Sequence, residues 1–270
     1  MQKPVPMRYL LLFPVLILLA ANAGPKTTDL VLVWSDEFEK PGLPDVAKWS
    51  YDTDGNASGW GNNEWQHYTA GRIENAFVED GMLHIRAIRE QAENKKYSSA
   101  RLITKGKGDW LYGRVEVRAK LPGTRGIWPA IWMLPTEWKY GGWPESGEID
   151  IMEHVGYMPD SVFASVHTKS YNHVIGTQRT KGLYLTDLHE NFHVYVLEWD
   201  SEQVRIFVDD NPYFSFRRES DDPNVWPFNQ KFHLLLNVAV GGNWGAVKGV
   251  DSNGFPQEMI VDYVRVYQKK

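Results

Sequence analysis

The most informative part of the sequence is Trp143-Pro-Glu-Ser-Gly-Glu-Ile-Asp-Ile-Met-Glu-His-Val-Gly156, which sets three acids among aliphatic side chains. Side chains alternate between the two faces of a strand, so Glu148 and Asp150 share one face and the isoleucines share the other. An uninterrupted strand would place Glu153 on the aliphatic face, where an unpaired carboxylate costs on the order of several kcal/mol. A one-residue β-bulge near Ile151-Met152 removes this conflict, because it turns Glu153 onto the face of the other two acids. The sequence therefore predicts a bulged strand that carries three carboxyl groups in a row.

Two carboxyl groups that flank a bond, with a third between them, suit the hydrolysis of a glycosidic bond. Retaining glycosidases hold their two carboxyl groups roughly 5 to 5.5 Å apart, and inverting enzymes hold them roughly 6.5 to 9.5 Å apart. Glu148 and Glu153 lie two same-face steps apart, so their side chains must lean toward each other. This spacing favours retention.

Further short runs of alternating polar and apolar residues, separated by turn residues, predict an all-β sandwich. No long amphipathic helix, repeat or linker divides the chain, so we expect a single domain over residues 24–270. The expected strands are 81–89, 113–121, 161–167, 193–199, 203–209, 213–217, 231–240 and 259–268.

Gly-Glu-Ile-Asp-Ile-Met-Glu resembles the active-site strand of glycoside hydrolase family 16 in its bulged, laminarinase-like form. The resemblance covers nearly the whole chain after its first residues. It implies an all-β jelly-roll sandwich of two antiparallel sheets with a concave substrate cleft, and the open cleft implies endo-action. The other stretches that carry it are Trp34-Ser-Asp-Glu-Phe38, Asn62-Asn-Glu-Trp-Gln-His-Tyr-Thr69, Gly126-Ile-Trp-Pro-Ala-Ile-Trp-Met-Leu-Pro135, Val240-Gly-Gly-Asn-Trp244 and Val261-Asp-Tyr-Val-Arg-Val-Tyr267.

The three acids are expected to divide the catalytic work between them. Our hypothesis makes Glu148 the nucleophile and Glu153 the general acid and then the base, with Asp150 sharing a proton or hydrogen bond with Glu148. Neighbouring negative charge and burial are expected to raise the pKa of Glu153. A metal cluster is the rival explanation for these acids. Against it, no His or Cys set with ligand spacing accompanies the strand, and the catalytic step needs no cofactor.

Aromatic side chains offer platforms for the apolar faces of sugar rings. Trp128 and Trp132 are four residues apart and therefore lie on the same side of a regular strand. Pro129 between them lacks an N–H, which predicts an edge or irregular strand. Trp143 and Trp244 lie in Gly-rich loops and are further candidates for substrate contact.

Polar residues complete the expected substrate site. His167 ends a predicted strand and is expected to bond a carboxylate or a sugar hydroxyl if that strand lies beside the acid strand. By resemblance, the loop containing Asn62, Asn63 and Arg72 reaches over the non-reducing-end side of the cleft.

The resemblance also implies a structural calcium ion on the convex side. Glu37, Gly81 and Asp262 occupy the corresponding positions, and oxygen ligands suit Ca²⁺.

Residues 1–23 are typical of a secretory signal peptide, with basic Lys3 and Arg8, a short apolar run and the Ala21-Asn-Ala23 cleavage pattern. We therefore expect a secreted protein, extracellular or periplasmic, with no membrane span in its mature form. Removing Lys3 and Arg8 changes the formal charge from -5 to -7. This mildly acidic balance gives no reason to expect nucleic acid as a partner, and we expect a monomer whose partner is a neutral polysaccharide. The chain has no Cys, so no disulfide framework is available.

Together these patterns predict a retaining endo-β-1,3-glucanase that acts on laminarin-like glucan. Hydrolysis of mixed-linkage β-1,3-1,4-glucan, transglycosylation with the same intermediate, and non-catalytic glucan binding by a lectin on the same fold remain open at this point.

Overall fold

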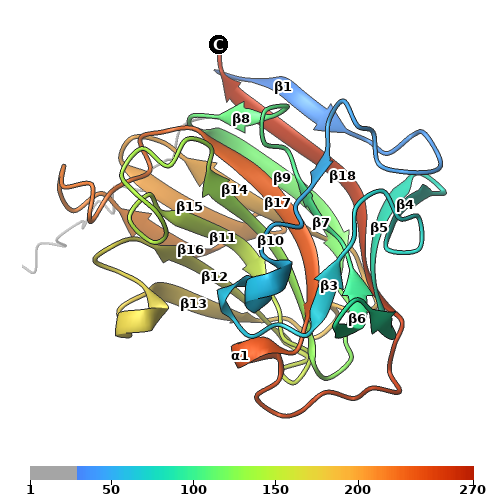
Figure 1. Ribbon diagram of the computed structural model, residues 1–270. Coiled ribbons are helices and arrows are strands. Elements are labelled where there is room, and N and C mark those ends of the chain that lie inside the picture. The colour runs from blue at the N-terminus through green and yellow to red at the C-terminus, as the bar shows by residue number, and fades with distance from the viewer. Residues whose placement is uncertain (1–28) are drawn as a thin grey trace, which may run out of the picture.

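The structure is a computed structural model that describes residues 29–270. The predicted signal peptide, residues 1–23, lies outside the described residues. Two β-sheets form two layers (Figure 1). The larger sheet contains, in spatial order, β16 (Asn211–Arg217), β15 (Gln203–Val208), β14 (His193–Trp199), β9 (Gly113–Lys120), β18 (Gln257–Lys269), β5 (Met82–Ala92), β6 (Lys95–Ser99) and β3 (Gln66–Tyr68), with β1 (Leu30–Asp36) paired to β18 and β4 (Ala76–Glu79) paired to β5.

The smaller sheet carries the acid strand near its centre. Its strands are, in spatial order, β13 (Arg179–Tyr184), β12 (Ser161–His167), β11 (Glu148–Glu153), β10 (Ile127–Pro135), β17 (Phe232–Val240), β7 (Arg101–Ile103) and β2 (Ser50–Tyr51), with β8 (Asp109–Trp110) paired to β17. Its strand pairs are all antiparallel, and the parallel pair among the described strands is β3 with β6, in the larger sheet.

Alternation of side chains explains how the two layers pack. In β9, Val115, Val117 and Ala119 are buried in the core, whereas the charged residues between them are half-buried on the other face. The eight strands predicted from the sequence are all present, with ends that differ by at most three residues. The all-β, two-sheet prediction is therefore confirmed.

Helical structure among the described residues is confined to short turns. These are the 3₁₀ turns η2 (Asn56–Gly61) and η3 (His173–Ile175) and the single-turn helix α1 (Gly242–Gly245). None of the helices in residues 29–270 has the length and apolar character needed to span a membrane.

The prediction that Pro129 marks an edge or irregular strand is wrong, because β10 lies between β11 and β17. The carbonyl of Pro129 accepts a hydrogen bond from the N–H of His154, 3.2 Å away and just beyond the end of β11. The nitrogen of a strand residue points to the same side as its carbonyl. The missing donor therefore faces the end of β11, and the ladder with β17 stays intact.

A buried histidine predicts a pH-dependent stability. Burial lowers the pKa of His154 to about 4, whereas an unfolded histidine titrates near about 6.5. The unfolded chain therefore binds the proton at higher pH than the native protein. The stability that neutral His154 contributes is present above about pH 6.5 and is lost as the pH falls toward 4, by about 3 kcal/mol.

Urea unfolding between pH 7 and pH 4 tests this expectation. The slope of unfolding free energy against pH should be shallower in His154→Gln than in the wild type. His67→Gln, at the half-buried His67 of β3, is the control, and an equal slope in His154→Gln and the wild type would contradict the prediction.

Candidate active site

The predicted bulge is present in β11. Toward β10, Met152 pairs with Ile131 and Asp150 pairs with Trp132, so Ile151 is the extra residue. The ladder with β12 shifts by one residue in the same place. Ile151 and Met152 are both fully buried in the core. Two consecutive core-facing residues thus return Glu153 to the face of Glu148 and Asp150, as the alternation argument predicts.

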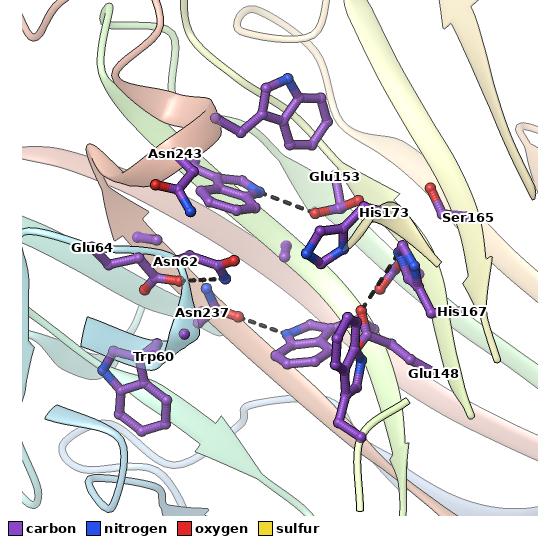
Figure 2. Close-up of a pocket in the computed structure, with 18 of the residues that line it drawn as sticks. Trp60, Asn62, Glu64, Glu148, Glu153, Ser165, His167, His173, Asn237 and Asn243 are labelled. Carbon is purple, nitrogen blue, oxygen red and sulfur yellow. Dashed lines mark hydrogen bonds and ion pairs between the residues drawn. The ribbon is translucent and has the colours of Figure 1, made fainter. Parts of the chain in front are cut away.

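The outer face of the smaller sheet forms the floor of a cleft of about 760 Å³. Figure 2 shows residues from several elements pointing into it around Glu148 and Glu153. One end is formed by the η2 segment with β7, and the other by β12, β13 and the η3 turn. Its aromatic, charged and polar lining includes Trp60, Asn62, Glu64, Arg101, Trp128, Trp132, Trp143, Glu148, Asp150, Glu153, Phe163, Ser165, His167, His173, Thr180, Asn237, Asn243 and Trp244.

Glu153 has the properties of a general acid. Burial raises the pKa of its carboxyl well above the usual value, and the negative charge of Asp150 adds to this effect. The indole N–H of Trp128 donates to Glu153 Oε1 at 3.1 Å and opposes the rise (Figure 2). The carboxyl is therefore protonated well above the pH at which an ordinary glutamic acid ionises.

The carboxyl group of Asp150 interacts strongly with that of its neighbour Glu148. Burial raises the pKa of Asp150 well above its usual value, and the negative charge of Glu148 acts in the same direction. His167 Nε2 lies 3.3 Å from Asp150 Oδ2 and 3.8 Å from Glu148 Oε1. Since β12 pairs with β11, His167 stands opposite Glu148 in the ladder, as the sequence analysis required for this contact. The two carboxyl groups can share one proton, so the pair as a whole keeps one negative charge.

Glu148 is held from its other side by an aromatic side chain. The indole N–H of Trp143 donates to Glu148 Oε2 at 2.8 Å. The ring of Trp143 lies 6.0 Å from that of His167 and 5.0 Å from that of His173, measured between centroids. Trp143 thus fixes the orientation of the carboxylate as well as contributing to the wall of the cleft.

The cleft has aromatic surface on both sides of the acids. On one side the guanidinium of Arg101 lies over the rings of Trp60 and Trp132, at 4.3 and 4.6 Å from their centroids. On the other, Trp244 meets the rings of Trp128 and Phe163 edge to face. Such surfaces suit the apolar faces of sugar rings.

Replacing Trp128 with Phe should move the basic limb of the kcat/KM profile to higher pH. The change removes the N–H that stabilises ionised Glu153, so the pKa of the carboxyl rises and the acid stays protonated to higher pH. Trp132→Phe is the matched control, because its indole N–H donates to the Asn237 amide oxygen at 2.7 Å and not to a carboxylate. Initial rates on laminarin across the pH range give both limbs. A basic limb that stays in place in Trp128→Phe, or moves equally in the control, would contradict this role for the indole.

The structure brings most of the predicted substrate residues to the cleft. Trp128, Trp132, Trp143, His167 and Trp244 all line it. Asn62 also lines it, and its amide donates to Glu64 Oε1 at 3.1 Å.

Two predicted residues are not brought to the cleft. The side-chain amide of Asn63 donates to Asn243 Oδ1 at 2.8 Å on the exposed side of the loop. The guanidinium of Arg72 is bound by both carboxylate oxygens of Glu90. Arg72 therefore lies outside the cleft, because an acid on β5 pairs with it.

Several cleft residues were not singled out from the sequence. Glu64 is buried, and burial raises the pKa of its carboxyl. It lies in the quoted run beginning at Asn62, so the motif itself carried a signal. Arg101 and Asn237 carried none, because each reaches the cleft only through long-range strand pairing.

The structure brings together three possible metal ligands, although the spacing of residues along the acid strand argued against a metal site. One atom each from Glu148, Asp150 and His167 lie within 4.8 Å of one another. The third ligand comes from the neighbouring strand, which the spacing argument did not consider. A cation there would have to displace the proton of Asp150, since the pKa of this carboxyl is raised.

The expected calcium ligands lie where two strands meet end to end along β18. The end of β1 faces Val264, and the start of β5 pairs near Val261, so both flank Asp262. The carboxylate of Glu37 is bound by Arg265 at 2.9 and 2.8 Å, and that of Asp262 by Arg118 at 2.6 Å. The backbone positions fit a shared site, but a calcium ion would have to replace these guanidinium contacts.

Known proteins resemble this chain over most of its length. The model of the family "Glycosyl hydrolases family 16" matches residues 65–265. A β-glucanase of Rhodothermus marinus is 53% identical in an alignment 258 residues long that covers 93% of this chain and 90% of that protein.

Solved structures agree with this match. The X-ray structure of the laminarinase from Rhodothermus marinus has a TM-score of 0.87 at 54% identity, and the match covers 89% of this chain and 98% of that one. SCLam, a non-specific endo-β-1,3(4)-glucanase, has a TM-score of 0.86 at 48% identity, with 90% of this chain and 92% of that chain covered.

Proposed function

Because the chain belongs to glycosyl hydrolase family 16, where it is a laminarinase-like endo-β-glucanase, we propose that it cleaves β-1,3-glucan with retention of configuration. The observation that carries the proposal is the bulge in β11, which sets Glu148 and Glu153 on one face on either side of Asp150. The two outer acids differ in their surroundings as a double displacement requires. Glu148 is oriented by the Trp143 indole, and the pKa of Glu153 is raised by burial.

The mechanism follows from these environments. Glu148 attacks the anomeric carbon and forms a glycosyl ester, while Glu153 donates its proton to the departing glycosidic oxygen. Once the negative charge of Glu148 has disappeared into the ester, Glu153 ionises more easily. It then removes a proton from water, which attacks the anomeric carbon and releases the sugar with its original configuration.

The cleft supports attack within a chain. Lining residues continue from Trp60 and Asn62 on one side of the acids to Ser165 and Thr180 on the other. A sugar can thus be held on each side of the bond that breaks. A lectin needs only such platforms, whereas this chain also has an oriented Glu148 and a Glu153 of raised pKa, which catalysis requires and binding does not.

Product profiling on laminarin, lichenan and curdlan tests the function. We expect new reducing ends from laminarin with wild type, strong loss with Glu153→Ala, and a first-formed β-anomer by NMR. A first-formed α-anomer would refute retention, and cleavage of lichenan alone would favour the mixed-linkage alternative for which SCLam gives a precedent. Binding without new reducing ends would identify a lectin, and longer products than the substrate would reveal transglycosylation.

We also propose export after cleavage near Ala23 and a structural calcium ion held by Glu37, Gly81 and Asp262. Amino-terminal sequencing of the mature protein tests the first. For the second, added CaCl₂ should raise the melting temperature of EDTA-treated protein, because a ligand that binds only the native state stabilises it. The same gain in Glu37→Gln as in the wild type would refute this site.

A further inference from the structure

Residues 57–65 form one wall of the cleft and are called the wall segment here. A second hollow, of about 510 Å³, lies on the far side of this wall segment. It is lined by this segment, by Asn94 in the turn after β5 and by the first two residues of β6, and β6 lies beside β3 in Figure 1. The segment turns successive side chains to different sides. Asn62 lines the cleft, whereas Asn63 and Trp65 line the second hollow. Ser58 and Glu64 border both.

Trp65 forms a fixed platform in this hollow. Its backbone N–H donates to the carbonyl of Val240 at 2.8 Å, which ties it to the end of β17. Its ring lies over Gly241, where an added Cβ would sit 2.6 Å from ring atoms Cγ and Cδ2. One face of the indole is thus packed on glycine backbone, and the side chain is still 43% exposed. A flat aromatic face that is held from behind and open in front is the surface that a sugar ring stacks on.

Polar groups surround the platform. Asn94, in the turn after β5, and Lys96, near the start of β6, are exposed in the hollow. Asn63 is held there by Asn243, and its own amide oxygen is free of that contact. Lys95 donates to the carbonyl of Glu64 at 2.8 Å, which joins the start of β6 to the wall segment. The donors and the ring therefore belong to one connected unit.

We propose that this hollow is a second binding site for neutral β-glucan, separate from the catalytic cleft. Trp65 stacks on a sugar ring, and Asn63, Asn94 and Lys96 bond its hydroxyls. The site rests on the proposed glucanase function, since the ligand is the polymer that the cleft cleaves. It lets the enzyme hold a neighbouring stretch or strand of an insoluble glucan while the cleft works. Two weak contacts on one polymer raise the overall affinity without any change in the cleft.

Binding to insoluble curdlan tests the site, measured by sedimentation with full-length protein that carries Glu148→Gln so that the polymer is not consumed. We expect Trp65→Ala to weaken the apparent affinity about fivefold. In protein with Glu148 intact, kcat/KM on a short soluble β-1,3-oligosaccharide should stay unchanged. Tyr184→Ala is the matched control, because Tyr184 is 70% exposed on β13 and lines neither hollow. Unchanged curdlan affinity in Trp65→Ala would overturn the proposal.

A second variant distinguishes the role of the Trp65 ring in sugar binding from its role in packing on Gly241. If Trp65→Ala also loses activity on the short oligosaccharide, the Asn94→Ala/Lys96→Ala double variant decides, because it leaves the ring in place. Weaker curdlan binding with normal oligosaccharide cleavage in that variant supports the site, and wild-type binding overturns it. Failure of the proposed function looks different, since the wild type itself would then cleave no β-1,3-glucan.

Discussion

Glu148→Gln is expected to lower kcat on laminarin by at least about 10⁴-fold, with oligosaccharide affinity close to that of the wild type. The amide keeps the shape of the carboxylate and still accepts the Trp143 hydrogen bond. It cannot form the glycosyl ester, so the first step of the reaction fails while the walls of the cleft stay in place. Initial rates and calorimetric titration of an oligosaccharide measure the two quantities separately. Activity near the wild-type level would remove Glu148 from the nucleophile role.

Azide sharpens this test with the smaller Glu148→Gly variant. Azide can enter the space left by the carboxylate and attack the anomeric carbon from the same side. The product is then an α-glycosyl azide, formed with inversion in a single displacement. Because azide is already charged, it needs no base, but Glu153 must still protonate the leaving group. A β-azide from this variant would contradict the assignment.

Glu153→Ala is expected to lower kcat on laminarin by about 10² to 10⁴-fold, the usual contribution of a general acid or base. The loss should be small for the first step on an aryl glycoside with an acidic phenol as leaving group, because that oxygen needs no proton to depart. The glycosyl-enzyme then accumulates, since no base activates water, and a burst of phenol precedes a slow steady state. Added azide should release it as the β-azide.

The pH profile gives an independent readout of the same residue. In the wild type, kcat/KM falls as the pH rises through the pKa of Glu153, which burial and the charge of Asp150 hold high. Glu153→Ala has no such group, so this basic limb should disappear. A basic limb that persists at the same pH would show that another group donates the proton.

The bulge in the acid strand was predictable because regular alternation of side chains would have placed Glu153 in the core. Glu148 and Glu153 are five positions apart, which puts them on opposite faces of a regular strand, and a charged side chain cannot lie in the core without a partner. A bulge is the smallest repair, and the structure contains it. The roles of neighbouring residues were less accessible, since the pairing of β12 with β11 decides whether His167 reaches the acids.

Loop residues and distant partners were harder to place. Arg72 has the chemistry of a sugar-binding residue, but Glu90 on β5 binds it, and nothing near Arg72 in the sequence indicates this pair. Asn63 meets Asn243, which lies 180 residues later in the chain. Arg101 enters the cleft because β7 pairs with β17, a contact between segments more than 130 residues apart. Such contacts depend on the assembled sheet order and not on local pattern.

The doubled core residues of β11 have a consequence for changes in chain length. If either Ile151 or Met152 were deleted, the strand would regain simple alternation, and all three acids would still point outward. Deleting Ile149 would instead drive Glu148 and Asp150 onto opposite faces. One residue can therefore be lost at that point while the three acids keep a common face, whereas the loss of Ile149 separates Glu148 from Asp150.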